Sequence, residues 1–169
     1  RKILVVDDDE SVMDLIEGIL LLAKYQVLEA GSEAKALKIL ELDPPDAAII
    51  DVHLTKMKDM RGFELCRGIK TNLRTQHIPV MMMSSDDRDE NLILRSFAAN
   101  AVDFMRKPFK AVELLTRLEK RLEDTSPLKW ALDAGRFARA GNICLDVESH
   151  EVFFKEGKLT RLPPILASL

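Results

Sequence analysis

A group of acidic side chains follows two apolar runs of the sequence and could support phosphoryl chemistry. Asp7 and Asp8 come directly after the run at 3–6, and Asp51 comes directly after the run at 47–50. Carboxylates that are held close together repel one another unless they take up a proton or bind a hard cation. Their oxygens suit Mg²⁺, and an aspartate beside Mg²⁺ can attack a phosphoryl group.

A hydroxyl and a cation at later positions could complete that chemistry. Ser84 ends an apolar run that begins at residue 80, and Lys107 follows a further expected strand at 102–106. Phosphoryl transfer requires neutralisation of the charge on the transferred oxygens, which an ammonium and a hydroxyl can provide. Side chains at the carboxyl ends of parallel strands meet at one edge of a sheet, where ligands bind. We therefore predict one site that contains Asp51, its acidic neighbours, Ser84 and Lys107.

The elements that must position these residues alternate between strands and helices. We predict strands at 3–6, 26–30, 47–51, 80–84 and 102–106. Between and after them we predict helices at about 10–24, from the N-cap Ser32 to Pro44, at 62–70, from the acids at 86–89 to 98, and at 111–123. This alternation predicts an α/β fold with right-handed crossovers, a flavodoxin-like five-stranded parallel sheet of order 2-1-3-4-5, and helices on both faces.

The pattern changes after residue 124, where Thr125-Ser126-Pro127 interrupts it. We predict a first domain at 1–124, a linker at 125–140 that can form a short helix, and a mainly β segment at 141–169. Strands are expected at 143–147, 152–154 and 159–162. The apolar residues after Pro163-Pro164 suggest the first turn of a helix, so we expect the natural chain to continue past Leu169.

Composition excludes several classes of protein. The formal net charge is −3, which does not favour a nucleic-acid or anionic membrane surface. Cys66 and Cys144 show neither metal-ligand spacing nor a disulfide framework. No signal peptide or long apolar run is present, so we expect a cytoplasmic protein that does not bind a membrane. The chain starts on Arg1 rather than Met, which suggests a trimmed N-terminus.

The first 124 residues resemble the receiver domains of two-component response regulators. The resemblance rests on VVDDD, IIDVHL, GFELCRGIK, IPVMMMSS and VDFMRKPF, which occur in the family's order and with its spacing. It implies phosphorylation by a sensor histidine kinase or a phosphotransfer protein, with Mg²⁺ as cofactor. It implies the following roles: phosphoacceptor Asp51; magnesium ligands Asp7, Asp8, Asp51 and the backbone carbonyl of His53; phosphate-pairing residue Lys107; switch residues Ser84 and Phe104.

The loop after the phosphoacceptor strand departs from the family pattern. The segment from Leu54 to Gly62 is longer than usual, contains added lysines and lacks the usual proline. Because this loop borders the phosphate site in the family, we expect it to affect access to the site and the rate of dephosphorylation. The metal site itself should be unaffected.

The resemblance also implies a two-state switch. Phosphorylation would draw Ser84 toward the phosphate and turn Phe104 inward, which changes the surface of the fourth helix, fifth strand and fifth helix. In OmpR/PhoB-type regulators this surface forms a homodimer on activation, and Asp103, Glu113 and Arg117 match its charged residues. The basic residue usual on the fourth helix is replaced by Ile93, and Arg95 could substitute for it.

The C-terminal stretch has a second resemblance. NICLDVESHEVFFKEGKLTRLPP is similar to the β-sheet that precedes the winged-helix domain of OmpR/PhoB-type regulators. The DNA recognition helix of that class would lie beyond Leu169. We therefore expect DNA binding and transcription regulation only through an output domain that continues past this sequence.

Other functions remain as alternatives at this point. A signalling adaptor could use the same receiver without binding DNA. A phosphatase of the haloacid dehalogenase type also uses a nucleophilic aspartate but needs Asp-x-Asp, whereas residue 53 is His. A receiver locked in one state should lack part of the Asp, Ser and Lys set. Asp7 and Asp8 could also simply stabilise a helix N-terminus. We expect no enzymatic activity beyond self-phosphorylation and slow hydrolysis.

Overall fold

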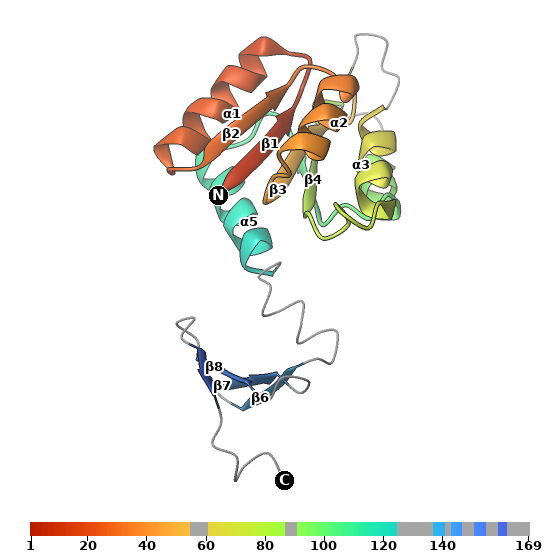
Figure 1. Ribbon diagram of the computed structural model, residues 1–169. Coiled ribbons are helices and arrows are strands. Elements are labelled where there is room, and N and C mark those ends of the chain that lie inside the picture. Colours follow the sequence, from red (N-terminus) through yellow and green to blue (C-terminus); the bar gives the residue numbers. More distant parts are fainter. Residues whose placement is uncertain are drawn as a thin grey trace. The chain divides into compact units, whose positions relative to one another are not determined.

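The computed structural model describes residues 1–54, 61–86 and 91–124, together with the backbone of strands at 137–140, 143–146, 151–154 and 159–161. The chain divides into two compact units, Arg1–Glu123 and Asp124–Leu169 (Figure 1). The elements of the first unit and the beginning of the second are β1 (Lys2–Val6), α1 (Glu10–Leu22), β2 (Gln26–Ala30), α2 (Glu33–Leu42), β3 (Ala47–Asp51), α3 (Arg61–Thr71), β4 (Val80–Ser84), α4 (Leu92–Ala98), β5 (Asp103–Arg106) and α5 (Ala111–Asp124).

The first unit has the predicted sheet. All its strand pairs are parallel, and their order is β2-β1-β3-β4-β5. Every residue of β3 and β4 is buried, as expected for central strands that are covered on both faces. Val6 pairs with Ile50, and Asp51 pairs with Met83, so the ends of neighbouring strands are aligned. The flavodoxin-like fold class is therefore confirmed.

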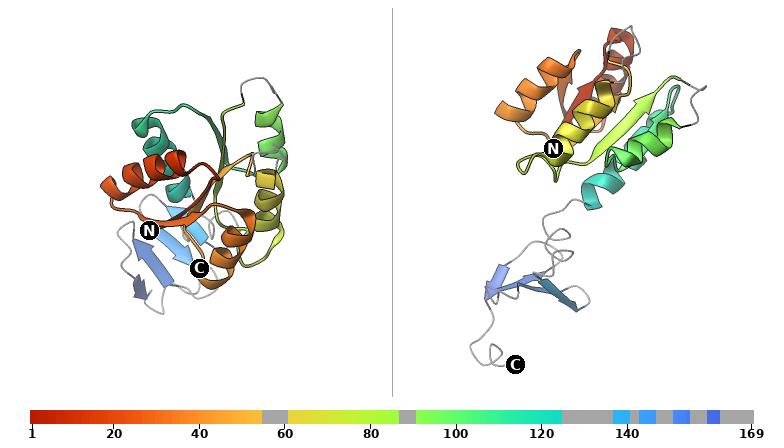
Figure 2. Two further views of the ribbon diagram at one scale, coloured as in Figure 1. Left: turned by 90° about the horizontal axis from the view of Figure 1, so that it is seen from above. Right: turned by 90° about the vertical axis from the view of Figure 1, so that its right-hand side faces the viewer.

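Helices cover both faces of this sheet (Figure 2). Helices α1 and α5 pack on one face, where Ile16, Leu20, Leu114 and Leu118 join the side chains of alternate strand residues. Helices α2, α3 and α4 cover the other face, and their buried residues form a second apolar cluster that contains Phe63. The sheet thus lies between two apolar layers, and polar residues at its carboxyl edge are the exception to this pattern.

The buried face of α1 differs from the stripe that the sequence suggested. The helical period of the sequence predicts one apolar stripe, made of Val12, Leu15, Ile16, Ile19 and Leu22, but the side chains of Leu15 and Leu22 are 54% and 88% exposed. Ile16 of that stripe is buried and Val12 and Ile19 are partly buried, while Met13 and Leu20 complete the buried face. The segment is apolar on several sides, so more than one stripe fits the helical period, and the packing against the sheet decides between them.

The second unit contains an antiparallel sheet of order β6-β7-β8-β9. Its strands are β6 (Phe137–Ala140), β7 (Ile143–Asp146), β8 (Glu151–Phe154) and β9 (Leu159–Arg161). Residues 137–140, which we expected in the linker, therefore form a strand, and Ala140 pairs with Ile143. The intervening sequence is Gly141-Asn142, a composition typical of two-residue hairpin connections. The rest of the predicted linker, 125–136, and the predicted helix start after Pro164 lie outside the described residues.

A search of the described helices finds none that is both long enough and apolar enough to span a membrane.

Candidate functional site

The carboxyl edge of the sheet brings three of the predicted residues into direct contact. Asp7 follows β1, Asp51 ends β3, and Lys107 follows β5. The Lys107 ammonium donates to Asp7 Oδ2 at 2.5 Å and to Asp51 Oδ2. The backbone N–H of Lys107 donates to the carbonyl of Ser84 at 2.8 Å, which fixes the start of this loop against the end of β4.

The electrostatics of this cluster reflect burial. The carboxylate residues Asp7 and Asp51 are 2% and 5% exposed. Burial raises the pKa of the Asp51 carboxyl above its ordinary value, although the nearby Lys107 ammonium opposes this effect. Burial by itself lowers the pKa of Lys107, but the charges and hydrogen bonds of Asp51 and Asp7 outweigh it, and that pKa is raised. Lys107 is therefore a permanent cation that holds two buried acids in place.

The Asp51 carboxylate is also oriented by its own loop. Its Oδ1 accepts a hydrogen bond at 2.8 Å from the backbone N–H of His53. The two imidazole nitrogens of His53 are buried and have no hydrogen-bond partner among the residues that the structure describes. Asp7 is held similarly, because its Oδ1 accepts from the N–H of Asp9 at 3.0 Å. Both carboxylates therefore have fixed orientations before any ligand binds.

A hollow of about 670 Å³ opens over these groups, and we call it the acidic hollow. Asp7, Asp8, Asp51, His53 and Lys107 contribute to its lining. Asp8 is exposed, and no ion pair or hydrogen bond of its carboxylate is found in the described part of the chain. Within residues 1–54, 61–86 and 91–124 no three acidic, His or Cys side chains are already arranged around a metal position. Mg²⁺ needs only one or two carboxylates and keeps several waters, so Asp8 and Asp51 beside an open hollow fit it.

The predicted switch residues lie near this site but do not line the hollow. The Ser84 residue is 1% exposed, and its Oγ accepts from the N–H of Asp86 at 3.0 Å. Its neighbour Ser85 lines the hollow instead. Phe104 is 8% exposed and belongs to the apolar cluster under α2, α3 and α4, so its ring lies inward in this structure.

A glycine that the sequence reading did not single out is required at the same edge. Gly62 lies in the first turn of α3, and its N–H donates to the carbonyl of Val52 at 3.1 Å. A Cβ at this position would overlap the carbonyl oxygen of Asp51 and lie 2.9 Å from its carbonyl carbon. Only glycine lets α3 approach the end of β3 this closely. The glycine is visible in the segment GFELCRGIK, but its close contact with Asp51 of the same chain cannot be deduced from that segment.

The residues predicted for a dimer face form a network within one chain. The Asp103 carboxylate accepts from Arg117 at 2.9 Å and from Arg121 at 3.1 Å, and Arg117 also pairs with Glu113 at 3.0 Å. The sequence reading missed Arg121, which lies one turn after Arg117 on the same side of α5. Arg95 lies with its guanidinium 5.0 Å from the centre of the Phe63 ring, which ties α4 to α3.

Comparison with known proteins identifies relatives of this chain. Residues 3–119 match the response regulator receiver domain family. The chain is 32% identical to the alkaline phosphatase synthesis transcriptional regulatory protein PhoP of Bacillus subtilis, over 96% of this chain and 68% of PhoP. It is 31% identical to the transcriptional regulator RpaA of Synechocystis, over 95% of this chain and 66% of RpaA. The chain therefore spans about two thirds of the length of these relatives.

A solved structure shows the same fold. The receiver domain of NtrX from Brucella abortus is 32% identical, with a TM-score of 0.64, and the match covers 72% of this chain and 98% of that domain.

Replacing Gly62 with alanine should disturb the site through the backbone. We expect Gly62→Ala to lower the free energy of unfolding by about 2 kcal/mol, because the new methyl group must displace the end of β3. Gly68→Ala in the same helix is the matched control, since a Cβ there meets nothing within 4 Å. It should be neutral or stabilising by up to about 1 kcal/mol. Urea unfolding of both variants measures the difference, and equal effects would contradict the assigned contact.

Removing the Lys107 cation should make the free energy of unfolding depend on pH between 5.5 and 7.5. We expect Lys107→Met to lower the free energy of unfolding by about 3 kcal/mol near pH 7, because buried carboxylates lose their partner. The pKa of Asp51, already raised by burial, then rises further. The folded state therefore takes up a proton before the unfolded state does, and stability recovers as the pH falls. Urea unfolding at pH 7.5 and 5.5 with a chelator tests this. Lys110→Met, an exposed control, should show no such recovery, and a pH-independent loss for Lys107→Met would refute the explanation.

Proposed function

The chain belongs to the response regulator family through its receiver domain at 3–119, and we propose that it accepts a phosphoryl group on Asp51. The donor is a histidine kinase or a phosphotransfer protein. The observation that carries this proposal is the Lys107 ammonium in contact with both Asp7 and Asp51 at the acidic hollow. A buried nucleophilic carboxylate with a fixed cation beside it is suited to receive a phosphoryl group.

The transfer step can be described from these residues. An oxygen of Asp51 attacks the phosphorus, and the bond between phosphorus and the donor's histidine nitrogen breaks. Asp7, Asp8, Asp51 and the carbonyl of His53 would hold Mg²⁺, which neutralises charge on the phosphoryl oxygens when bound. Lys107 already contacts Asp51 and would pair with a phosphoryl oxygen after the transfer.

We assign the switch to Ser84 and Phe104. The hydroxyl of Ser84 lies directly under the edge of the site and would turn toward a phosphoryl oxygen. Phe104 packs in the apolar cluster that also contains residues of α4, so a change at Ser84 can reach the α4, β5 and α5 surface. A few charge-assisted hydrogen bonds at roughly 1.5–3 kcal/mol each could move such an equilibrium.

The donor protein would dock on α1. This helix exposes Leu15, Leu21 and Leu22, by 54%, 52% and 88%, around the exposed Gly18. Leu15 lines both this apolar surface and the acidic hollow, so a helix packed there lies next to the phosphoacceptor. A Cβ at Gly18 meets nothing within 4 Å in this chain, which leaves room for close helix packing by a partner.

The output is dimerisation and transcription regulation. Exposed apolar residues of α4 and α5, Leu94, Phe97 and Val112, accompany the charged network of Asp103, Glu113 and Arg117. Relatives that share most of this chain are transcriptional regulators by name. DNA contact would come from an output domain of which β6 to β9 form the beginning.

A signalling adaptor without DNA binding is the second candidate. The response regulator PleD of Caulobacter vibrioides is 34% identical over 84% of this chain, yet the match covers only 33% of PleD. A similar receiver therefore occurs in a protein that is largely composed of other sequence.

Phosphorylation is tested with acetyl phosphate or beryllofluoride in the presence of Mg²⁺. We expect stoichiometric uptake by the wild type and none by Asp51→Asn, because the amide is not a nucleophile for this reaction. Asp46→Asn, which changes an acid far from the acidic hollow, should behave like the wild type. Light scattering should show a shift from monomer to dimer. Uptake that survives in Asp51→Asn would overturn the assignment, and uptake without a mass change would favour the adaptor.

Docking on α1 predicts a selective defect. We expect Leu22→Asp, on the part of the apolar surface that does not line the acidic hollow, to reduce phosphotransfer from a histidine kinase at least tenfold. Uptake from acetyl phosphate should stay within twofold of wild type, since only the first donor needs the apolar surface. Leu42→Asp, on the exposed side of α2, should change neither rate. The two rates are measured on the same protein preparation with a labelled phosphoryl group in each donor. Equal loss with both donors would show damage to the acidic hollow rather than loss of a docking surface.

A further inference from the structure

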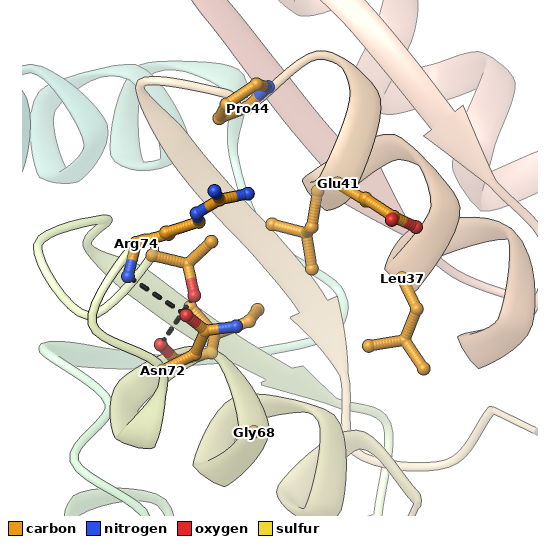
Figure 3. Close-up of a pocket in the computed structure, with 9 residues that line it drawn as sticks. Leu37, Glu41, Pro44, Gly68, Asn72 and Arg74 are labelled. Atoms are coloured by element: carbon orange, nitrogen blue, oxygen red, sulfur yellow. Dashed lines mark hydrogen bonds between the residues drawn. The ribbon is translucent and has the colours of Figure 1, made fainter.

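A groove between α2 and α3 lies apart from the acidic hollow and has no part in the proposed phosphorylation. Its volume is about 460 Å³, which is in the range of small-molecule sites. Leu37 and Leu40 of α2 and Ile69 of α3 give it apolar walls, and Arg74 stands at one side (Figure 3). None of its lining residues lines the acidic hollow.

The turn that carries Arg74 is held rigidly by hydrogen bonds. Thr75 Oγ1 donates to the carbonyl of Ile69 at 2.9 Å, and the N–H of Arg74 donates to Asn72 Oδ1 at 2.9 Å. The Lys70 ammonium also stabilises the end of this turn, because it donates to the carbonyls of Gln76 at 3.2 Å and Ile78 at 2.5 Å. Burial lowers the pKa of Lys70, so placing this cation here has a cost that the two carbonyls offset. The backbone from which the Arg74 side chain extends is thus fixed before any ligand binds.

The charged end of the Arg74 side chain, unlike its backbone, has no partner among the described residues. No ion pair or side-chain hydrogen bond of its guanidinium is found among the residues that the structure describes. Figure 3 shows its side chain extending from the turn toward Pro44, across the opening of the groove. Glu41 also lines the groove, but its carboxylate points away from Arg74. The positive charge of Arg74 therefore lies at one end of the groove, next to its apolar walls.

Gly68 adds a second unexplained feature. It lies inside α3, where glycine is less favourable than alanine by about 0.5–1 kcal/mol. A Cβ at this position would meet nothing within 4 Å, so no contact within the described chain requires glycine. The missing side chain leaves the wall of the groove open to close approach by another molecule.

From these observations we propose that the groove binds a small aliphatic carboxylate. The guanidinium of Arg74 would pair with the carboxylate, and the hydrocarbon tail would lie along Leu37, Leu40 and Ile69 beside Gly68. A single cation suits one carboxylate rather than a doubly charged phosphate. A helix of a partner protein would need a longer contact surface than this groove between α2 and α3 provides.

The proposal can be tested with hexanoate as the probe. The ¹⁵N-labelled full chain is titrated with sodium hexanoate, and backbone amide shifts of Gly68, Ile69, Asn72 and Arg74 are followed. We expect saturable shifts confined to the groove. Hexanamide has the same tail without the charge and should bind at least tenfold more weakly. Linear shifts without saturation, or equal binding of hexanamide, would overturn the proposal.

Variants separate the site from a general effect on folding. Arg74→Gln should weaken hexanoate binding about tenfold or more, whereas Arg67→Gln, an exposed arginine of α3 outside the groove, should not. Gly68→Leu should fold, because its side chain enters open space, and it should abolish binding by filling the groove. Equal affinities of Arg74→Gln and Arg67→Gln would refute the role of Arg74. Undiminished binding by folded Gly68→Leu would refute the location. Each outcome is read from hexanoate binding and not from phosphoryl uptake, so the test does not depend on the proposed function.

Discussion

The structure of the first unit depends on one electrostatic constraint, which is that two carboxylates from different strands are buried at the same edge of a sheet. Such a pair is stable only with a cation between its members, and Lys107 provides it. The cation lies 100 residues from Asp7 and 56 residues from Asp51 along the chain. All three strands must therefore be in register, because a one-residue slip would turn each of these side chains to the opposite face. The bond from the Lys107 N–H to Ser84 and the pairing of Ser84 with Arg106 provide that register.

Much of this arrangement was predictable from the sequence because it follows from short-range patterns. β1, β3 and β4 are mainly apolar runs, and each of them ends at or just before an Asp or Ser that marks the edge of the sheet. The alternation of strands with helices then leaves one reasonable topology. Ser32 was recognisable as the cap of α2, and its Oγ accepts from the N–H of Lys35 at 3.3 Å. The central contact of Asp7, Asp51 and Lys107 followed from strand order alone.

What escaped prediction depends on contacts between segments that are distant in sequence or on choices among similar side chains. The orientation of α1 could not be deduced, because Leu20, Leu21 and Leu22 are alike and only packing selects Leu20. The strand at 137–140 forms by pairing with β7, and its own sequence, Phe-Ala-Arg-Ala, does not indicate a strand. Gly62 is explained only by the distance to β3, and Arg121 only by the position of Asp103. The groove depends on a turn whose hydrogen bonds come from Lys70 and Thr75.

The two glycines of α3 show why residue type alone does not reveal a cause. Gly62 is required by a contact within the chain, whereas a Cβ at Gly68 would meet nothing within 4 Å among the described residues. The same helix therefore lies against the carbonyl of Asp51 at one end and forms a wall of the groove at the other. A rigid helix transmits a displacement at either end to the other. Linkage then requires reciprocity, so a ligand that favours one position of α3 would alter the equilibrium at Asp51 by the same factor by which phosphorylation alters the affinity of the groove. Binding in the groove and phosphorylation at Asp51 would thus both depend on where α3 lies relative to the end of β3.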